Sequence, residues 1–178
     1  MKLIIFGPPG SGKGTQAKII SEKLNLKHIS TGQIFREYFK NNNSFEAYNK
    51  EDYDKGVLAP DRVINSLIKN LLPKNNYLLD GYPRTLKQAE FFDSISNIDK
   101  VIALDVPFHT LKLRLLKRAE LEGRTDDNEE VIKNRYKIYR EQTEVLLKHY
   151  KEKVILIEGD RKVDEISKDI FEILENEN

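Results

Sequence analysis

The chain has 178 residues, and its 30 Lys and Arg side chains balance 29 Asp and Glu, which gives a net charge of +1 and a length typical of one domain. Cysteine is absent, and this excludes disulfide scaffolds, thiolate zinc sites and cysteine nucleophiles. The near-zero charge gives no support for nucleic-acid or membrane binding, and no apolar run reaches the roughly 18 residues of a membrane span, so we expect a cytoplasmic protein.

Five short apolar segments are typical of β-strands: Leu3–Phe6, Lys27–Ser30, Tyr77–Asp80, Val101–Asp105 and Val154–Glu158. Most are continuous rather than alternating, as in strands that are covered on both faces of a parallel sheet. Segments of helical periodicity separate them: Asp61 to Pro73, a helix that starts at Pro107, about Glu129 to Lys148, and Val163 to Leu174. This alternation predicts an α/β fold with a doubly wound, five-stranded parallel sheet.

Two segments interrupt the alternation. Residues 39–59 are polar and have little apolar density, and residues 119–128 form a short charged stretch between two predicted helices. Neither is typical of a core. Each is either a mobile cover over a site or a surface loop, and composition does not separate these two interpretations.

A glycine-rich segment, Gly7 to Lys13, follows the first predicted strand and precedes a helix, which is the structural context of a phosphate-binding loop. Glycines let the backbone N–H groups turn toward phosphate oxygens, the helix N-terminus adds partial positive charge, and Lys13 adds a full charge. The residue after the lysine is Gly14 rather than Ser or Thr, and the hydroxyl comes one residue later, at Thr15. Water-mediated contact between this hydroxyl and Mg²⁺ is therefore expected.

Charged residues beyond the strand ends suggest the chemistry. Asp80 ends a predicted strand, where a carboxylate either faces a metal ion or caps the turn at Gly81; we favour the metal-facing role, through water. Arginines follow strand ends or flank the two non-core segments: Arg36, Arg84, Arg118, Arg124 and Arg135. Guanidinium groups converging on one cleft would suit two polyphosphates, although any one of them could also be a solvated surface charge.

Four motifs carry a resemblance: GPPGSGKGTQ from Gly7, STGQIFR from Ser30, LLDGYPRTLKQ from Leu78 and GRTDDNEEVIKNR from Gly123. In this order and spacing they resemble adenylate kinases of the short-lid kind, over nearly the whole chain. The resemblance implies reversible transfer of the terminal phosphoryl group of Mg²⁺-bound ATP to AMP, which gives two ADP. It also implies a single P-loop kinase domain over residues 1–178, with a helical AMP-binding insert at about 30–59 and a lid at about 119–128.

The same resemblance implies the roles of particular residues. ATP would contact the phosphate loop, a lid-side arginine and one position near the C-terminus: Gly10, Ser11, Gly12, Lys13, Gly14, Thr15, Arg118 and Arg161. AMP would contact the insert and the loop after Asp80, with Gln88 reading the adenine edge: Thr31, Arg36, Val57, Leu58, Ala59, Gly81, Tyr82, Pro83, Arg84 and Gln88. Arg124 and Arg135 would also contact AMP and would close over the transferring group. Catalysis would rest on Lys13, Arg84, Arg118, Arg124 and Arg135.

Three departures from the family pattern stand out. Gln33 replaces an aspartate, Tyr82 replaces a phenylalanine and so adds a hydroxyl, and Arg161 replaces a glycine. The three histidines, His28, His109 and His149, are scattered and are interpreted as structural or surface residues. AMP phosphate is already anionic, so the reaction needs no general base.

Two alternatives are weighed. UMP/CMP kinases share this scaffold, the lid arginines and the phosphate loop, but Thr31, Thr85 and Gln88 favour AMP as the acceptor. A P-loop GTPase would need an NKxD motif, which occurs as Asn49 to Asp52 without a preceding apolar strand. We further expect a monomer that uses Mg²⁺ with ATP, binds no zinc, and has no nucleic-acid or membrane partner.

Overall fold

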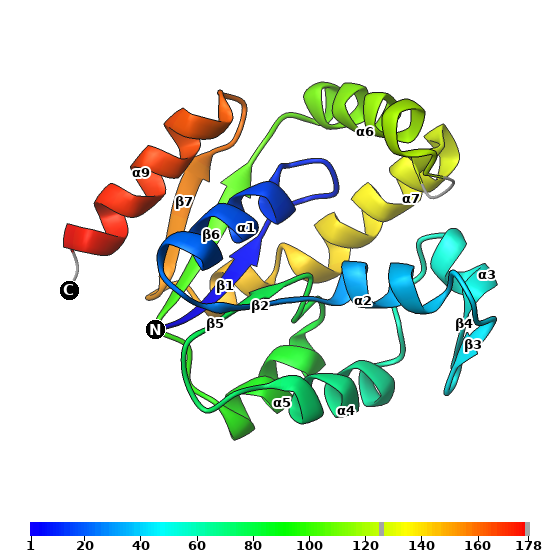
Figure 1. Cartoon of the computed structure of the whole chain (residues 1–178), viewed down its shortest axis with the longest axis horizontal. Coiled ribbons are helices and arrows are strands. Elements are labelled where there is room, and N and C mark those ends of the chain that lie inside the picture. Colours follow the sequence, from blue (N-terminus) through cyan, green and yellow to red (C-terminus); the bar gives the residue numbers. More distant parts are fainter. Residues whose placement is uncertain (125–126, 177–178) are drawn as a thin grey trace.

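A computed structural model describes residues 1–124 and 127–176 of the chain. Within these residues five parallel strands form a central sheet in the spatial order β2-β5-β1-β6-β7 (Figure 1). The strands are β1 (Lys2–Phe6), β2 (Lys27–Ser30), β5 (Tyr77–Asp80), β6 (Lys100–Asp105) and β7 (Val154–Glu158). This is the predicted α/β fold, and each predicted strand end lies within one residue of the observed end.

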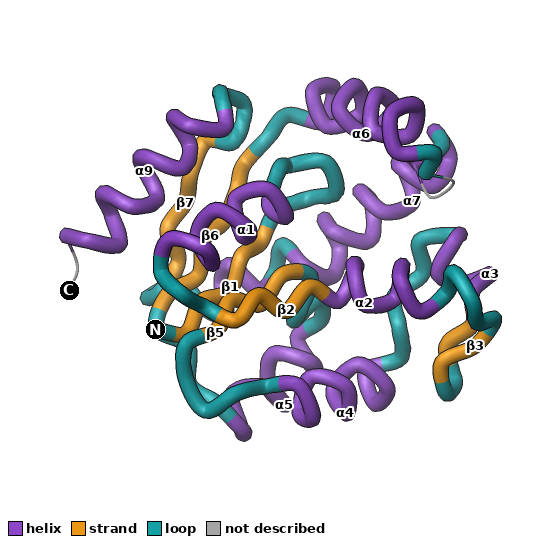
Figure 2. The backbone as a smooth tube through the Cα atoms, in the orientation of Figure 1, coloured by secondary structure: helices purple, strands orange, loops and turns teal. Residues whose placement is uncertain are grey.

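Helices cover both faces of the sheet, as Figure 2 shows. They are α1 (Lys13–Lys23), α2 (Thr31–Tyr38), α3 (Lys50–Asp54), α4 (Asp61–Leu71), α5 (Leu86–Ile95), α6 (Phe108–Glu122), α7 (Glu129–Ile138), α8 (Leu146–His149) and α9 (Val163–Asn176). No helix in the described part of the chain has the length and apolarity needed to cross a bilayer.

The hydrophobic core has two layers, one on each face of the sheet. Leu3 and Ile5 of β1 face α1 and α9, while Ile4 and Phe6 face the layer that includes α4, α5 and α8. Successive strand residues point to opposite faces, so a strand with helices on both sides must be apolar at every position. This explains why the strand segments are continuous apolar runs.

The helix predicted from Glu129 to Lys148 is not continuous. α7 ends at Ile138, a π-helical turn covers Tyr139–Thr143, and α8 begins at Leu146. The amide of Glu144 bonds the carbonyl of Tyr139, a spacing of five residues. Turns of this kind insert one residue into a helix and are frequent at functional sites.

The insert between β2 and α4 contributes aromatic side chains to the core layer on one face of the sheet, so the expectation that residues 39–59 contribute nothing to a core is wrong. Phe39 and Tyr48 are 3% and 4% exposed and pack with Phe35, whose ring centroid lies 5.1 Å from that of Tyr48. A hairpin of β3 (Ser44–Phe45) and β4 (Tyr48–Asn49), together with α3, completes this unit at the end of α2 (Figure 1). The buried residues are few and aromatic, so average hydropathy does not reveal them.

Candidate active site

The phosphate-binding loop connects β1 to α1. Gly12 has φ of +88°, a left-handed conformation that favours glycine, and it lies immediately before the first residue of α1. Because Gly12 has no side chain to bond the first N–H groups of α1, those groups are available to an anion. The amide of Ser11 and the Nζ of Lys13 both donate to the Pro8 carbonyl, at 3.1 and 3.3 Å, which holds the loop closed.

Lys13 lies among other cations. Burial lowers the pKa of Lys13 to about 7, the charge of Asp80 opposes this shift, and the nearby charges of Arg84, Arg135 and Arg118 add to it. An anion bound beside these groups would favour the protonated form of Lys13 and so raise its pKa. The loop therefore combines directed N–H groups with positive charge that an anion would stabilise.

Asp80 ends β5 beside the phosphate loop and is almost fully buried. Its Oδ2 accepts a hydrogen bond from Ser30 Oγ at 3.1 Å and lies 3.6 Å from His28 Nε2. Burial alone would raise the pKa of Asp80, but the neighbouring His28, the charge of Lys13 and the Ser30 hydroxyl outweigh it and hold the pKa below its usual value. The carboxylate is thus ionised, and a Cβ atom at Gly14 would lie only 3.6 Å from it.

A buried carboxylate that sequence reasoning missed brings three predicted arginines together. Asp127 is 0% exposed, and Arg118 binds it in a bidentate manner, with Nε at 2.6 Å and a terminal nitrogen at 2.8 Å. Arg124 Nε and Arg135 approach the same carboxylate at 3.3 and 3.1 Å. Among the described residues, the Asp127 carboxylate therefore contacts all three guanidinium groups and holds them near one another. Residues 125 and 126 of the expected lid lie outside the described residues.

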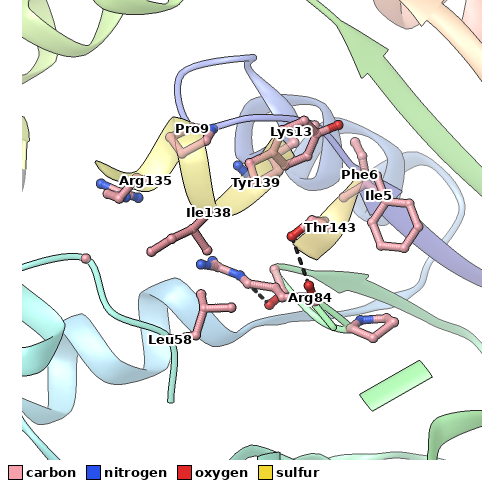
Figure 3. Close-up of a pocket in the computed structure, with 14 residues that line it drawn as sticks. Ile5, Phe6, Pro9, Lys13, Leu58, Arg84, Arg135, Ile138, Tyr139 and Thr143 are labelled. Atoms are coloured by element: carbon pink, nitrogen blue, oxygen red, sulfur yellow. Dashed lines mark hydrogen bonds between the residues drawn. The ribbon is translucent and has the colours of Figure 1, made fainter. Parts of the chain in front are cut away.

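Arg84 reaches the same region from the loop after β5. Its Nε donates to the Gly81 carbonyl at 2.9 Å, and its own carbonyl accepts a hydrogen bond from Thr143 Oγ1 at 3.0 Å. Lys13, Arg84 and Arg135 line one cavity. In Figure 3, Thr143 of the π-helical turn lies between Lys13 and Arg84. The predicted convergence of arginines is therefore present for these side chains.

A second cavity lies between the insert and the end of β5. Predicted acceptor residues line it: Thr31, Val57, Leu58, Ala59, Gly81, Arg84 and Gln88. The side chain of Gln88 is held at both ends, because its Nε2 donates to Asp61 Oδ1 at 2.8 Å and its Oε1 accepts from the Arg84 amide at 2.7 Å. The two cavities share Leu58, Gly81 and Arg84, so they adjoin.

Predicted ATP-binding residues line a third cavity on the donor side: Gly10, Ser11, Gly12, Lys13, Gly14, Thr15, Arg118 and Arg161. Arg124 lines it too, and so does Arg36, which was predicted to contact AMP but does not line the second cavity. Arg161 is turned toward α9, where it bonds Asp169 at 2.5 Å. Pro83 lines the cavity of Figure 3, whereas the side chain of Tyr82 is fully buried in the core behind it.

The structure also places the three histidines and the NKxD tetrapeptide. His28 lies beside Asp80, His149 bonds Asp93 at 2.7 Å, and His109 is exposed. The NKxD tetrapeptide forms the start of α3, where the Asn49 side chain accepts from the Asp52 amide at 2.8 Å. Asn49 is therefore a helix cap, and the resemblance to a guanine-binding motif is coincidental.

Comparison with known proteins identifies the family. The family model described as Adenylate kinase matches residues 5–155. The chain is 44% identical to an adenylate kinase of Leptospira biflexa, over 96% of this chain and 97% of that protein. It is 40% identical to an adenylate kinase of Nocardia farcinica, over 94% and 95% of the two chains, and 38% identical to one of Methanothrix thermoacetophila, over 98% of each.

The chain belongs to the adenylate kinase family. As an adenylate kinase it transfers a phosphoryl group reversibly between ATP and AMP. The family assignment does not favour the UMP/CMP kinase and GTPase alternatives. Adenylate kinases act on ATP, AMP and ADP, and the cavities on the two sides of Arg84 have the chemistry that such substrates require: cations and N–H groups for phosphates, and an oriented amide for a base.

Proposed function

We propose that ATP and AMP bind end to end, with their phosphates meeting in the cavity lined by Lys13, Arg84 and Arg135. The observation that carries this proposal is the arrangement of cavities. The cation-lined cavity shares residues with the phosphate loop on one side and with the Gln88 cavity on the other. A donor and an acceptor would then approach each other in line, which is the geometry of phosphoryl transfer.

The donor side is proposed to bind ATP. The N–H groups of Gly10 to Thr15 would hold the β- and γ-phosphates, with the ammonium group of Lys13 beside them. Arg118 would contact the same phosphates. The main chain of Arg161 would contact the adenine, while its side chain would take no part. The hydrogen bond to Asp169, which turns the side chain toward α9, supports this proposal.

The acceptor side is proposed to bind AMP. The phosphate would lie against Arg84, and Arg36 would reach it from the donor-side cavity that it lines. The backbone of residues 57–59 and of residues 81–83 would enclose the nucleoside, with Thr31 beside it. The amide of Gln88 would read the adenine edge. Its orientation by Asp61 and the Arg84 amide supports this role, because a fixed donor–acceptor pair discriminates between bases better than a mobile one.

The chemistry is proposed to need no general base. The attacking oxygen of AMP carries a negative charge, so the protein's task is to align the phosphates and to stabilise charge on the transferring group. Arg84, Arg124 and Arg135 would supply that charge, with Lys13 and Arg118 holding the leaving diphosphate. Exclusion of water by a lid at residues 119–128 would prevent hydrolysis of ATP.

Family kinases use ATP with Mg²⁺, and the residues here fit that ion. Asp80 is an ionised, buried carboxylate next to the phosphate loop, and oxygen donors are what Mg²⁺ prefers. We propose that Asp80 and Thr15 hold Mg²⁺ through water, where the ion would neutralise phosphate charge. The described residues contain no group of three or more His, Cys, Asp or Glu side chains arranged for a metal. Metal analysis of the purified protein would contradict the expectation of no zinc if it found stoichiometric zinc.

The domain arrangement also stays a proposal: one P-loop kinase domain over residues 1–178, with the AMP-binding insert at about 30–59. The aromatic contacts among Phe35, Phe39 and Tyr48 support its treatment as one structural unit. We further propose a monomer that acts in the cytoplasm and needs no nucleic-acid or membrane partner. Light scattering after size-exclusion chromatography and cell fractionation test these two statements.

A coupled assay tests the proposed arrangement most directly. Initial rates are measured with ATP and a panel of AMP, UMP, CMP and GMP, and we expect the highest kcat/KM with AMP. A bisubstrate mimic that joins two adenosines through five phosphates should compete with both ATP and AMP. Competition with only one substrate, or preferred turnover of UMP or CMP, would overturn the proposal.

A further inference from the structure

Tyr82 occupies a position where the adenylate kinase pattern has phenylalanine, two residues before Arg84. Its ring is 0% exposed and packs edge-on against Phe92, with 5.9 Å between the ring centroids. A phenylalanine ring would make the same packing contact. What this chain adds is a hydroxyl group inside the core, and a buried hydroxyl requires a hydrogen-bond partner.

The hydroxyl of Tyr82 joins two helices that border the acceptor cavity. It donates to Asn65 Oδ1 of α4 at 2.8 Å, and the main-chain carbonyl of Gln88 in α5 is a second acceptor at 3.1 Å. Burial raises the pKa of Tyr82, and the charges of Asp61 and Asp93 add to the rise, so the hydroxyl keeps its proton and remains a donor.

The same two helices are joined a second time by the side chain of Gln88. Gln88 Nε2 and Thr85 Oγ1 both donate to Asp61 Oδ1, at 2.8 and 3.0 Å. Asp61 and Asn65 are four residues apart in α4 and so lie on the same face of that helix. Asp61 thus holds the Gln88 side chain, while Asn65 is tied through Tyr82 to the Gln88 backbone.

We propose that Tyr82 is a positioning residue for acceptor recognition: its hydroxyl ties α4 to the backbone of Gln88 and so fixes the amide that reads the adenine base. This inference rests on the proposed adenine-reading role of Gln88. A residue held at its backbone and at both ends of its side chain cannot turn its amide over to suit a different base. The Tyr82 hydroxyl therefore contributes to the selection of AMP over other nucleoside monophosphates.

The hydroxyl is removed by Tyr82→Phe, which keeps the ring. With AMP varied at saturating ATP, we expect KM for AMP to rise three- to tenfold, as for the loss of one hydrogen bond, and the kcat/KM ratio of AMP to UMP to fall by a similar factor. KM for ATP should stay within twofold of the wild type, because neither Tyr82, Asn65 nor Gln88 lines the donor-side cavity.

Tyr77→Phe is a matched control in the same core. Tyr77 is also 0% exposed and also packs edge-on against Phe92, but its hydroxyl bonds Ser96 Oγ at 2.6 Å, away from the acceptor cavity. This variant loses a buried hydroxyl and its hydrogen bond, so its melting temperature should fall. Its KM for AMP and its AMP-to-UMP ratio should stay within twofold of the wild type.

A second route removes the other partner of the hydrogen bond. Asn65→Ala should raise KM for AMP in the same direction as Tyr82→Phe, and the double variant should be no worse than Tyr82→Phe alone, because Asn65 acts through the Tyr82 hydroxyl. Asn70→Ala, which changes an exposed asparagine on the same helix, is the control for helix propensity and should leave KM for AMP unchanged. Asn65 is only partly buried, so this variant tests the inference even if Tyr82→Phe does not fold.

Three results would overturn the inference: KM for AMP within twofold of the wild type in Tyr82→Phe or Asn65→Ala, equal rises in KM for ATP and AMP, or the same effect in Tyr77→Phe. Gln88→Ala separates this failure from failure of the proposed function. If Gln88→Ala leaves KM for AMP unchanged, the proposed adenine-reading role is wrong. If Gln88→Ala raises it and the Tyr82 and Asn65 variants do not, only the positioning role is wrong.

Discussion

Replacing Asp127 by asparagine tests whether one carboxylate holds the arginine cluster. Asp127→Asn keeps the shape of the side chain and removes its charge. The three guanidinium groups would then lose the negative charge that each of them contacts at Asp127. At an effective dielectric constant of about 20, each attraction at 4 Å amounts to about 4 kcal/mol, most of it offset by the cost of desolvation. Breaking a buried pair by removing one partner costs about 3–5 kcal/mol in total.

We expect much of that loss to appear in kcat, because Arg118, Arg124 and Arg135 would no longer be held in position for the transferring group. A loss of about 3–4 kcal/mol corresponds to a fall in kcat of about 10²–10³-fold, since every 1.4 kcal/mol is a factor of ten. The assay is steady-state turnover at saturating ATP and AMP, with circular dichroism to confirm the fold.

Glu122→Gln is the matched control, because Glu122 also lies near Arg124, at 3.8 Å, but its side chain is 59% exposed. An exposed pair of this kind contributes little, so kcat should stay within twofold of the wild type. The reasoning is refuted if Asp127→Asn retains kcat within fivefold of the wild type, or if Glu122→Gln loses as much.

Three further predictions concern the cations and one glycine. Arg84→Ala should lower kcat by about 10³–10⁵-fold, as for other arginines that stabilise a transferring phosphoryl group; near-native kcat would remove its assigned role. Gly56→Ala should lower kcat about tenfold or more, because the new Cβ would lie 2.5 Å from Arg135 Cγ. Gly123→Ala is its control: Gly123 has a similar positive φ but no neighbour within 4 Å, so this variant should lose stability and keep its kcat. Equal effects of the two variants on kcat would contradict this reasoning. Binding of the bisubstrate mimic at pH 8 should take up about 0.9 proton, because Lys13 with a pKa of about 7 is mostly neutral there and becomes protonated beside phosphates. Calorimetry in buffers of different ionisation enthalpy measures this uptake, and Lys13→Met should abolish it.

The strands were predictable because they are buried on both faces. Ile4 and Ile5 point in opposite directions and are both covered, so the local sequence alone marks the strand. The order β2-β5-β1-β6-β7 was not predictable from local pattern, because it depends on which strand edges pair across long stretches of chain. The resemblance to adenylate kinases predicted the fold family, whereas the order and register of the strands come from the structure.

The remaining differences have physical reasons. The turn at Tyr139–Thr143 keeps an approximately helical apolar spacing, so periodicity could not separate α7 from α8. Phe39 and Tyr48 pack on other rings of the insert rather than on a long apolar face, which average hydropathy does not detect. Asp127 was visible in the lid motif only as one acid in a charged stretch. Its importance comes from complete burial among three arginines, which depends on the folded lid.

The π-helical turn changes the direction in which the residues after it point, relative to the residues of α7. Each residue of an α-helix advances about 100° around the axis, so the extra residue at Tyr139–Thr143 changes the direction of everything that follows relative to Arg135. Thr143 meets the Arg84 carbonyl and Leu146 enters the core in this phase. If the extra residue were deleted, the wide turn would close into a regular α-helix, and the Arg84 carbonyl would lose the Thr143 hydroxyl that reaches it from this turn. The contact between this turn and Arg84 therefore depends on the length of the segment as well as on its sequence.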